Sequence, residues 1–148
     1  MIKIICSGKI KEKYLNDAID EYKTRISKYT KLEIIEIKDE KSEKALEIEA
    51  KNIQKHIKPN DYIITLEIEG KELTSKQFAE QIDKILITKP NITFIVGSSN
   101  GLDNSIKKIS NYKLSFSKLT FPHQLFRVIL LEQIYRAFKI LNNETYHK

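Results

Sequence analysis

The chain has 148 residues, enough for one domain to bury an apolar core without help from a disulfide or a metal. Its single cysteine, Cys6, cannot form an internal disulfide, and no apolar run approaches the roughly 20 residues of a membrane span. The apolar start "MIKIIC" is too short for a secretory signal and is interrupted by Lys3. These features predict one domain over residues 1–148 and a cytoplasmic location.

The formal net charge of +6 is distributed unevenly along the chain. Residues 1–31 and 113–148 each carry a net charge of +4, whereas residues 32–112 carry −2. If the two ends meet in the fold, they form a positive face that would attract a polyanion such as RNA. A coding bias towards lysine explains the charge equally well.

Five short segments are rich in β-branched and aromatic residues and are predicted to be strands. They are residues 2–6, 32–37, 62–68, 92–96 and 112–116. The segments between them show helical spacing of apolar residues. These apolar positions are Leu15, Ala18, Ile19, Tyr22, Ile26 and Tyr29 in the first helix, Leu46, Ala50, Ile53 and Ile57 in the second, and Phe78, Ile82 and Ile85 in the third.

The sequence also marks where several helices begin. Ser42 is expected to cap the second helix, and Thr74 with Gln77 has the spacing of a capping box before the third. A short helix is predicted after Asp103. Pro122 is expected to open a long last helix, at a position where the missing N–H of proline costs nothing.

This alternation of strand and helix predicts an α/β fold, with a mostly parallel sheet covered by helices on both faces. The only four glycines, Gly8, Gly70, Gly97 and Gly101, all follow predicted strands. Ligands of open α/β sheets bind at this carboxyl edge. The loops 66–70, 97–101 and 116–121 are therefore candidate binding loops.

Several kinds of chemistry lack their usual motif in this chain. The three histidines are scattered and no zinc-binding spacing is present, so we predict no metal site. The loop "GSSNG" (97–101) has neither the dinucleotide-binding nor the phosphate-loop spacing. Its two serines do not lie in a nucleophile elbow. The residues alone therefore indicate a basic α/β domain with three candidate loops.

Three stretches resemble the RlmH family, small SPOUT-class methyltransferases that methylate a pseudouridine of large-subunit ribosomal RNA. They are "FIVGSSNGL" (94–102), "LSFSKLTFPHQLFRVILLEQIYRAFKI" (114–140) and the terminal "YHK" (146–148). The resemblance covers the whole chain in length and element order. One departure is Ser98, which stands where the family commonly has a second adjacent glycine, so the backbone there must accept a Cβ.

The resemblance implies a C-terminal trefoil knot, a homodimer and S-adenosylmethionine as cofactor. It places the cofactor against one residue near the end of the third predicted strand, one directly after the fourth and a continuous stretch that begins at the end of the fifth. These residues are Leu66, Gly97, Phe116, Ser117, Lys118, Leu119, Thr120 and Phe121.

The resemblance further implies methyl transfer to N3 of a pseudouridine in 23S ribosomal RNA, which needs no metal. We hypothesise that the C-terminal tail closes over the flipped-out base, either in its own pocket or in that of the other subunit. His147 would accept or relay the imide proton and Tyr146 would position the base. Phosphates would be bound by Arg127, Arg136, Lys139 and Lys148.

Two alternative functions remain open at this point. The first is the same cofactor chemistry on another RNA, such as a ribose or a base of tRNA. The second is a non-enzymatic ribosome-binding factor of the same fold, which would not bind the cofactor.

Overall fold

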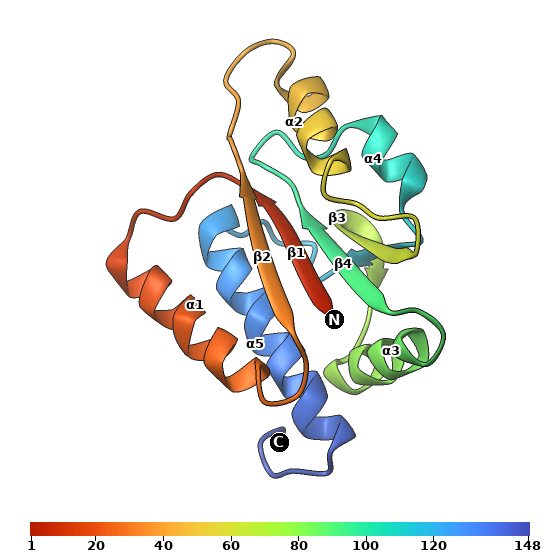
Figure 1. The fold of residues 1–148 in the computed structure, drawn as a ribbon. Helices are drawn as coiled ribbons and strands as arrows, with labels where there is room; N and C mark the ends of the chain where they lie inside the picture. The colour runs from red at the N-terminus through yellow and green to blue at the C-terminus, as the bar shows by residue number, and fades with distance from the viewer.

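Five strands alternate with five helices along the chain (Figure 1). The computed structural model describes residues 1–148. The elements are β1 (Ile2–Ser7), α1 (Lys13–Ile26), β2 (Leu32–Ile37), α2 (Ala45–Gln54), β3 (Asp61–Glu72), α3 (Ser75–Thr88), β4 (Asn91–Val96), α4 (Asn104–Ile109), β5 (Tyr112–Ser115) and α5 (His123–Leu141). All five predicted strands and all five predicted helices are present, with shifts of a few residues at their ends.

The strands form one sheet in the order β2-β1-β4-β3-β5, and every neighbouring pair is parallel. Strand β1 pairs with β2 on one side and with the central strand β4 on the other, so that Ile2 lies between Leu32 and Ile92. Both faces of β1 are buried, which explains its continuous apolar sequence. The predicted parallel sheet is confirmed.

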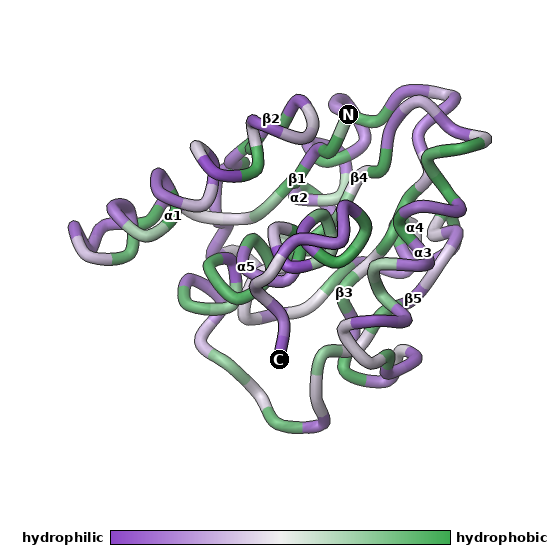
Figure 2. Tube along the Cα trace, turned by 90° about the horizontal axis from the view of Figure 1, so that it is seen from below, coloured by the Kyte–Doolittle hydropathy of each residue, from purple (hydrophilic) through white to green (hydrophobic).

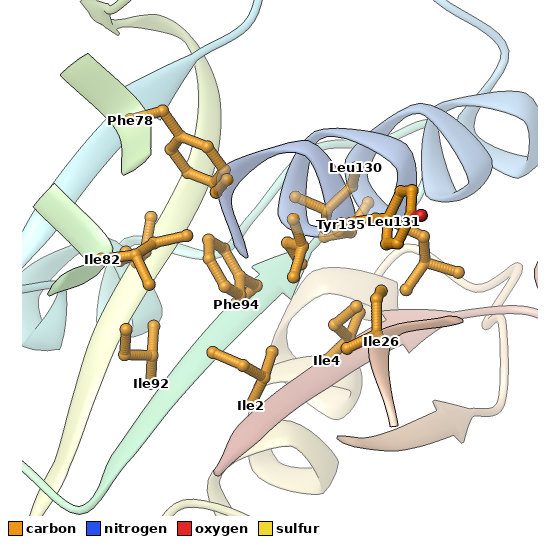
Figure 3. Packing of buried hydrophobic residues seen from close by; sticks show 14 of the residues in the cluster. Ile2, Ile4, Ile26, Phe78, Ile82, Ile92, Phe94, Leu130, Leu131 and Tyr135 are labelled. Atoms are coloured by element: carbon orange, nitrogen blue, oxygen red, sulfur yellow. The ribbon is translucent and has the colours of Figure 1, made fainter. Parts of the chain in front are cut away.

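Helices cover both faces of this sheet, as the sequence predicted. On one face α1, α3 and α5 bury a core of 22 residues, in which Phe94 of β4 meets Phe78, Ile82 and Leu130 (Figure 3). On the other face α2 and α4 cover a smaller core of eight residues around Ile95. No helix is long and apolar enough to cross a membrane.

The predicted helix starts are only partly correct. Thr74 and Gln77 form the capping box before α3, and the Asp103 carboxylate caps α4 by accepting from the Ser105 amide. The Ser42 cap is wrong. α2 begins after Lys44 without any side-chain cap, and the Ser42 carbonyl instead accepts a hydrogen bond from the Ala45 amide.

The prediction that Gly70 lies in a loop is also wrong. β3 continues to Glu72, and Leu114 of β5 pairs with Leu66 and again with Lys71, so residues 67–70 arch out of the ladder. A Cβ on Gly70 would lie 2.8 Å from the backbone of Lys113 and Leu114. Gly70 is therefore required by close approach of two backbones. The knot that the resemblance implies stays a prediction.

The two basic ends of the chain meet. α1 packs beside α5 on the same face of the sheet (Figure 1). The last residues are hydrophilic and lie against α5 (Figure 2). The two basic ends therefore lie together, as the positive face predicted from the sequence requires.

A buried ion pair joins β1 to β3 near the amino-terminal ends of the two strands. Lys3 Nζ lies 3.0 Å from the Asp61 carboxylate, and both side chains are almost fully buried. Burial by itself raises the pKa of the Asp61 carboxyl, but hydrogen bonds from the Lys58 amide, Lys3 and Asn91 outweigh it and leave the pKa below its usual value. The ionised carboxylate therefore stabilises the folded state.

Asp61→Ala should destabilise the protein by about 3–5 kcal/mol, because it leaves the Lys3 ammonium buried without its partner. Urea unfolding at pH 7 measures this loss. The control Lys3→Met/Asp61→Leu removes both charges and should recover most of it. Since the folded pKa of Asp61 is lowered, its contribution is present above about pH 4 and lost as the pH falls through the folded value. If stability fell with decreasing pH as steeply in Asp61→Ala as in the parent, the stabilising role of the Asp61 carboxylate would be contradicted.

Candidate active site

The three candidate loops meet at one cavity of about 540 Å³, within the size range of small-molecule sites. It lies where β3, β4 and β5 reach their carboxyl ends, and the first turn of α5 closes it. Seven of the eight predicted cofactor residues line it, whereas the exposed Lys118 does not. The seven are Leu66, Gly97, Phe116, Ser117, Leu119, Thr120 and Phe121.

The loop after β4 folds back tightly on itself. A Cβ on Gly97 would lie 2.5 Å from the carbonyl oxygen of Gly101, so no other residue fits this backbone. Ser98 bridges to Gly101, its carbonyl accepting from the Gly101 amide at 2.9 Å. Ser98 does not adopt a positive φ, so its backbone is open to a side chain, as the sequence required.

The loop after β5 is anchored by aromatic side chains. The Phe116 ring packs edge-on against Phe126 of α5 and Phe78 of α3, with centroids 5.0 and 6.1 Å away. Phe121 also packs against Phe126. The Leu119 side chain is 73 % exposed at the cavity rim. The loop therefore presents the exposed apolar side chain of Leu119 at the cavity, while packed aromatic rings hold the loop in place.

Few ionisable groups face the cavity, and Glu67 is the most enclosed of them. Its carboxylate is only 7 % exposed, accepts from the Thr65 hydroxyl at 2.7 Å, and lies 3.8 Å from Lys107 Nζ. Glu69 and His123 also line the cavity. Glu67 is not among the site residues predicted from the sequence. It stands two residues after the buried Thr65, which puts both side chains on one face of β3.

Arg127 is not a surface cation, and its predicted role in phosphate binding is wrong. The residue is 2 % exposed. Its guanidinium donates to the Glu36 carboxylate at 2.6 Å and to the Gly8 carbonyl at 3.0 Å. Arg127 therefore ties α5 to the ends of β1 and β2, beside the cavity. Its helical spacing gave no indication that it faces inward.

The tail folds back onto α5. The Tyr146 ring packs edge-on against Tyr135, with centroids 4.9 Å apart, and its hydroxyl donates to the Glu132 carboxylate at 3.2 Å. Burial, followed by the nearby Glu132 charge, raises the pKa of Tyr146 to about 12. The Arg136 guanidinium lies over the Tyr146 ring, pairs with Glu132, and donates to Nδ1 of His147 at 3.1 Å. The tail is thus held by specific contacts.

The other two predicted phosphate contacts differ in their surroundings. Lys139 pairs with Glu144 at 3.0 Å and lies over the rings of Tyr29 and Tyr135, and hydrogen bonding to Glu144 raises its pKa. Lys148 is exposed at the end of the chain. Lys148 therefore projects into solvent, whereas Lys139 is half-buried and holds the connector before the tail.

The cavity and the tail lie at opposite ends of α5. His123 and Phe126 line the cavity from the first turns, whereas the tail is bound at Arg136. Ten residues of helix from Phe126 to Arg136 correspond to about 15 Å along the axis. The residues predicted to act together are therefore not brought together within one chain. No group of three His, Cys, Asp or Glu side chains is placed to hold a metal ion.

Comparisons with known proteins identify the family of the chain. A family described as "Predicted SPOUT methyltransferase" matches residues 1–147. A protein from Methanococcus maripaludis named putative ribosomal RNA large subunit methyltransferase H is 58 % identical, over 99 % of both chains. Ribosomal RNA large subunit methyltransferase H of Clostridium beijerinckii is 53 % identical over 99 % of both chains.

A solved structure shares the fold at much lower sequence identity. It is that of a probable methylase family protein from Haemophilus influenzae, which is 16 % identical and aligns with a TM-score of 0.59. The alignment covers 99 % of this chain and 70 % of the other. This likeness concerns the fold alone.

Gly97→Ala should weaken binding of S-adenosylmethionine, the cofactor that the resemblance implies, by more than about tenfold in Kd, a loss of about 1.4 kcal/mol. The added Cβ collides with the Gly101 carbonyl and must displace the loop. Calorimetry measures the affinity, and circular dichroism should show an intact fold.

Gly101→Asn is the matched control. Gly101 has a φ of 84°, a Cβ there meets no atom within 4 Å, and asparagine tolerates positive φ better than most residues. Affinity should stay close to that of the parent. Equal losses in the two variants would contradict a specific role for the approach at Gly97.

Proposed function

The chain belongs to the SPOUT methyltransferase family, and on this premise we propose that it transfers a methyl group from S-adenosylmethionine to N3 of a pseudouridine in 23S ribosomal RNA. The observation that carries the proposal is the convergence of three loops on one cavity at the carboxyl edge of the sheet. The names of relatives more than half identical over nearly their full length support the ribosomal RNA substrate.

The residues of the cavity fit this cofactor. Phe116, Leu119 and Phe121 offer apolar surface to an adenosine, and the tight turn at Gly97 lets backbone groups approach it. The enclosed Glu67 carboxylate is the natural neighbour for a cationic ligand. When bound, the cofactor supplies a methyl group activated by its sulfonium. The protein then has to orient the base and keep water from the methyl group, contributions that can reach several kcal/mol.

We further propose a composite site in a homodimer. The tail cannot reach the cavity of its own chain, because it is bound about 15 Å away along α5. The outer side of α5 carries Leu125, which is 41 % exposed, with the half-buried Val128 and Ile129 following. Two copies packed antiparallel along this stripe would cover it and bring each tail to the cavity of its partner.

In this arrangement the tail completes the site for the base. Tyr146 would position the flipped-out ring, and His147 would contact its imide. Lys148 would bind a phosphate. Arg136 and Lys139 would add to the positive charge there, although each is already paired with a carboxylate. The meeting of the basic ends on one face favours RNA over a neutral substrate. A ribosomal RNA substrate implies a cytoplasmic enzyme.

The substrate assignment can be tested directly. Incubated with S-adenosylmethionine and ribosomes that lack the modification, the protein should methylate one pseudouridine of 23S RNA, detected by mass spectrometry of nuclease fragments. Naked 23S RNA and tRNA serve as comparisons. Methylation of tRNA alone would favour the alternative RNA substrate. Absence of cofactor binding in calorimetry would favour a non-enzymatic binding factor.

The composite site predicts complementation between two inactive variants. Removal of residues 146–148 should lower methyl transfer by at least about 100-fold while cofactor affinity is kept, and Gly97→Ala should be inactive at cofactor concentrations well below its weakened Kd. Mixed dimers of the two combine an intact cavity with an intact tail from the partner, so activity should return. If each tail served its own cavity, the mixture would stay inactive. Light scattering must show a dimer, and a stable monomer at micromolar concentration would contradict the arrangement.

A further inference from the structure

The contact between Arg136 and His147 defines the protonation of the imidazole. Nη1 of Arg136 lies 3.1 Å from Nδ1 of His147. A guanidinium can only donate hydrogen bonds, so Nδ1 must be the acceptor. An imidazole that accepts at Nδ1 carries its proton on Nε2. In this conformation His147 is neutral and presents an N–H, not a lone pair, on the side away from Arg136.

The guanidinium of Arg136 is itself fixed by several neighbours. Its second nitrogen pairs with the Glu132 carboxylate, four residues earlier on α5. Its Cζ atom lies 4.9 Å from the centroid of the Tyr146 ring, and the Tyr146 hydroxyl donates to the same carboxylate. Glu132, Arg136 and Tyr146 therefore hold each other in place through contacts that do not involve His147. Such a network leaves one orientation for the donor that contacts His147.

We propose that His147 serves as an Nε2–H hydrogen-bond donor to a carbonyl oxygen of the target uracil ring, with Arg136 as the positioning residue that fixes this tautomer. The inference rests on the proposed function. It replaces the hypothesis that His147 removes the imide proton, since the nitrogen with a free lone pair is already used by Arg136.

The chemistry of an imide suits a donor at this position. N3 of the ring is flanked by two carbonyl groups and is weakly acidic. N3 loses its proton to water, its electron pair forms the bond to the methyl carbon, and the sulfur keeps the electrons of the bond that breaks. The negative charge that develops on the ring is shared with the carbonyl oxygens, where an N–H donor stabilises it.

Several charged and titratable groups surround the tail and bear on the pH dependence of the reaction. The imidazole of His147 contacts Arg136, which Glu132 neutralises, and Tyr146 stays protonated at neutral pH because its pKa is raised to about 12. From α1, Tyr22 adjoins Tyr146 and Arg25 lies over the rings of Tyr22 and Tyr135. Lys139 pairs with Glu144, and Lys148 follows His147 directly. The two carboxylates among these groups, Glu132 and Glu144, are each paired with a cation.

Two substitutions of His147 distinguish a donor from a base. His147→Gln keeps an N–H donor but cannot accept a proton, whereas His147→Ala has neither property. Removal of one positioned donor costs about 100- to 1,000-fold in kcat, so His147→Ala should lose at least that much. His147→Gln should stay within about tenfold of the parent and keep its pH profile. Equal losses in both variants would overturn the donor role.

The tautomer can be measured without cofactor or RNA. In long-range proton–nitrogen spectra of the full-length protein, His147 should show a protonated Nε2 and an unprotonated Nδ1. Arg136→Met should mix the two tautomers, whereas the matched control Lys148→Met, which removes a neighbouring cation, should not. A protonated Nδ1 in the parent protein would overturn the proposal. Inactivity of the parent on every pseudouridine would instead overturn the proposed function, and the spectra separate the two failures.

Discussion

The cavity depends on two places where one backbone touches another because a side chain is absent. At Gly70 a Cβ would lie 2.8 Å from the backbone of β5, and at Gly97 one would lie 2.5 Å from the Gly101 carbonyl. The first contact lets β3 arch over β5, and the second closes the turn after β4. Neither contact tolerates even alanine without displacement of backbone. A lysine-rich chain with four glycines thus uses two of them to build the walls of a single site.

The remaining wall is placed by α5, which also separates the cavity from the C-terminal tail. Buried Arg127 ties the first turns of this helix to the ends of β1 and β2, and Phe126 supports the loop that follows β5. The far end of the helix holds the tail through Arg136. One helix therefore fixes both the cavity and the tail, about 15 Å apart along its axis, and the proposed composite site would need a second copy of the chain to bring them together. A helix is well suited to this task because its length is set by its residue count.

The sequence predicted the sheet well, because parallel strands buried on both faces have continuous apolar runs that differ from helical spacing. It also indicated the segments that line the cavity, because ligand sites in this architecture lie at strand carboxyl ends. It misplaced Gly70, since the arch of β3 depends on contact with Lys113 and Leu114 of β5, more than 40 residues later in the chain. It misread Arg127 for a similar reason, because a buried arginine has partners that only the folded chain supplies. Local patterns do not contain such long-range contacts.

The tail shows how the enzyme can act without a strong base. The Tyr146 phenol stays protonated, because burial and the Glu132 charge raise its pKa to about 12, and it donates its one proton to Glu132. In the proposed arrangement His147 is held as a donor by Arg136, which occupies its Nδ1. His147 would therefore offer a proton to a base that must lose one, and Tyr146 would position the ring. An imide that releases its proton to water needs stabilisation of the resulting charge more than it needs a base, and one fixed donor would supply it where water would have to reorient.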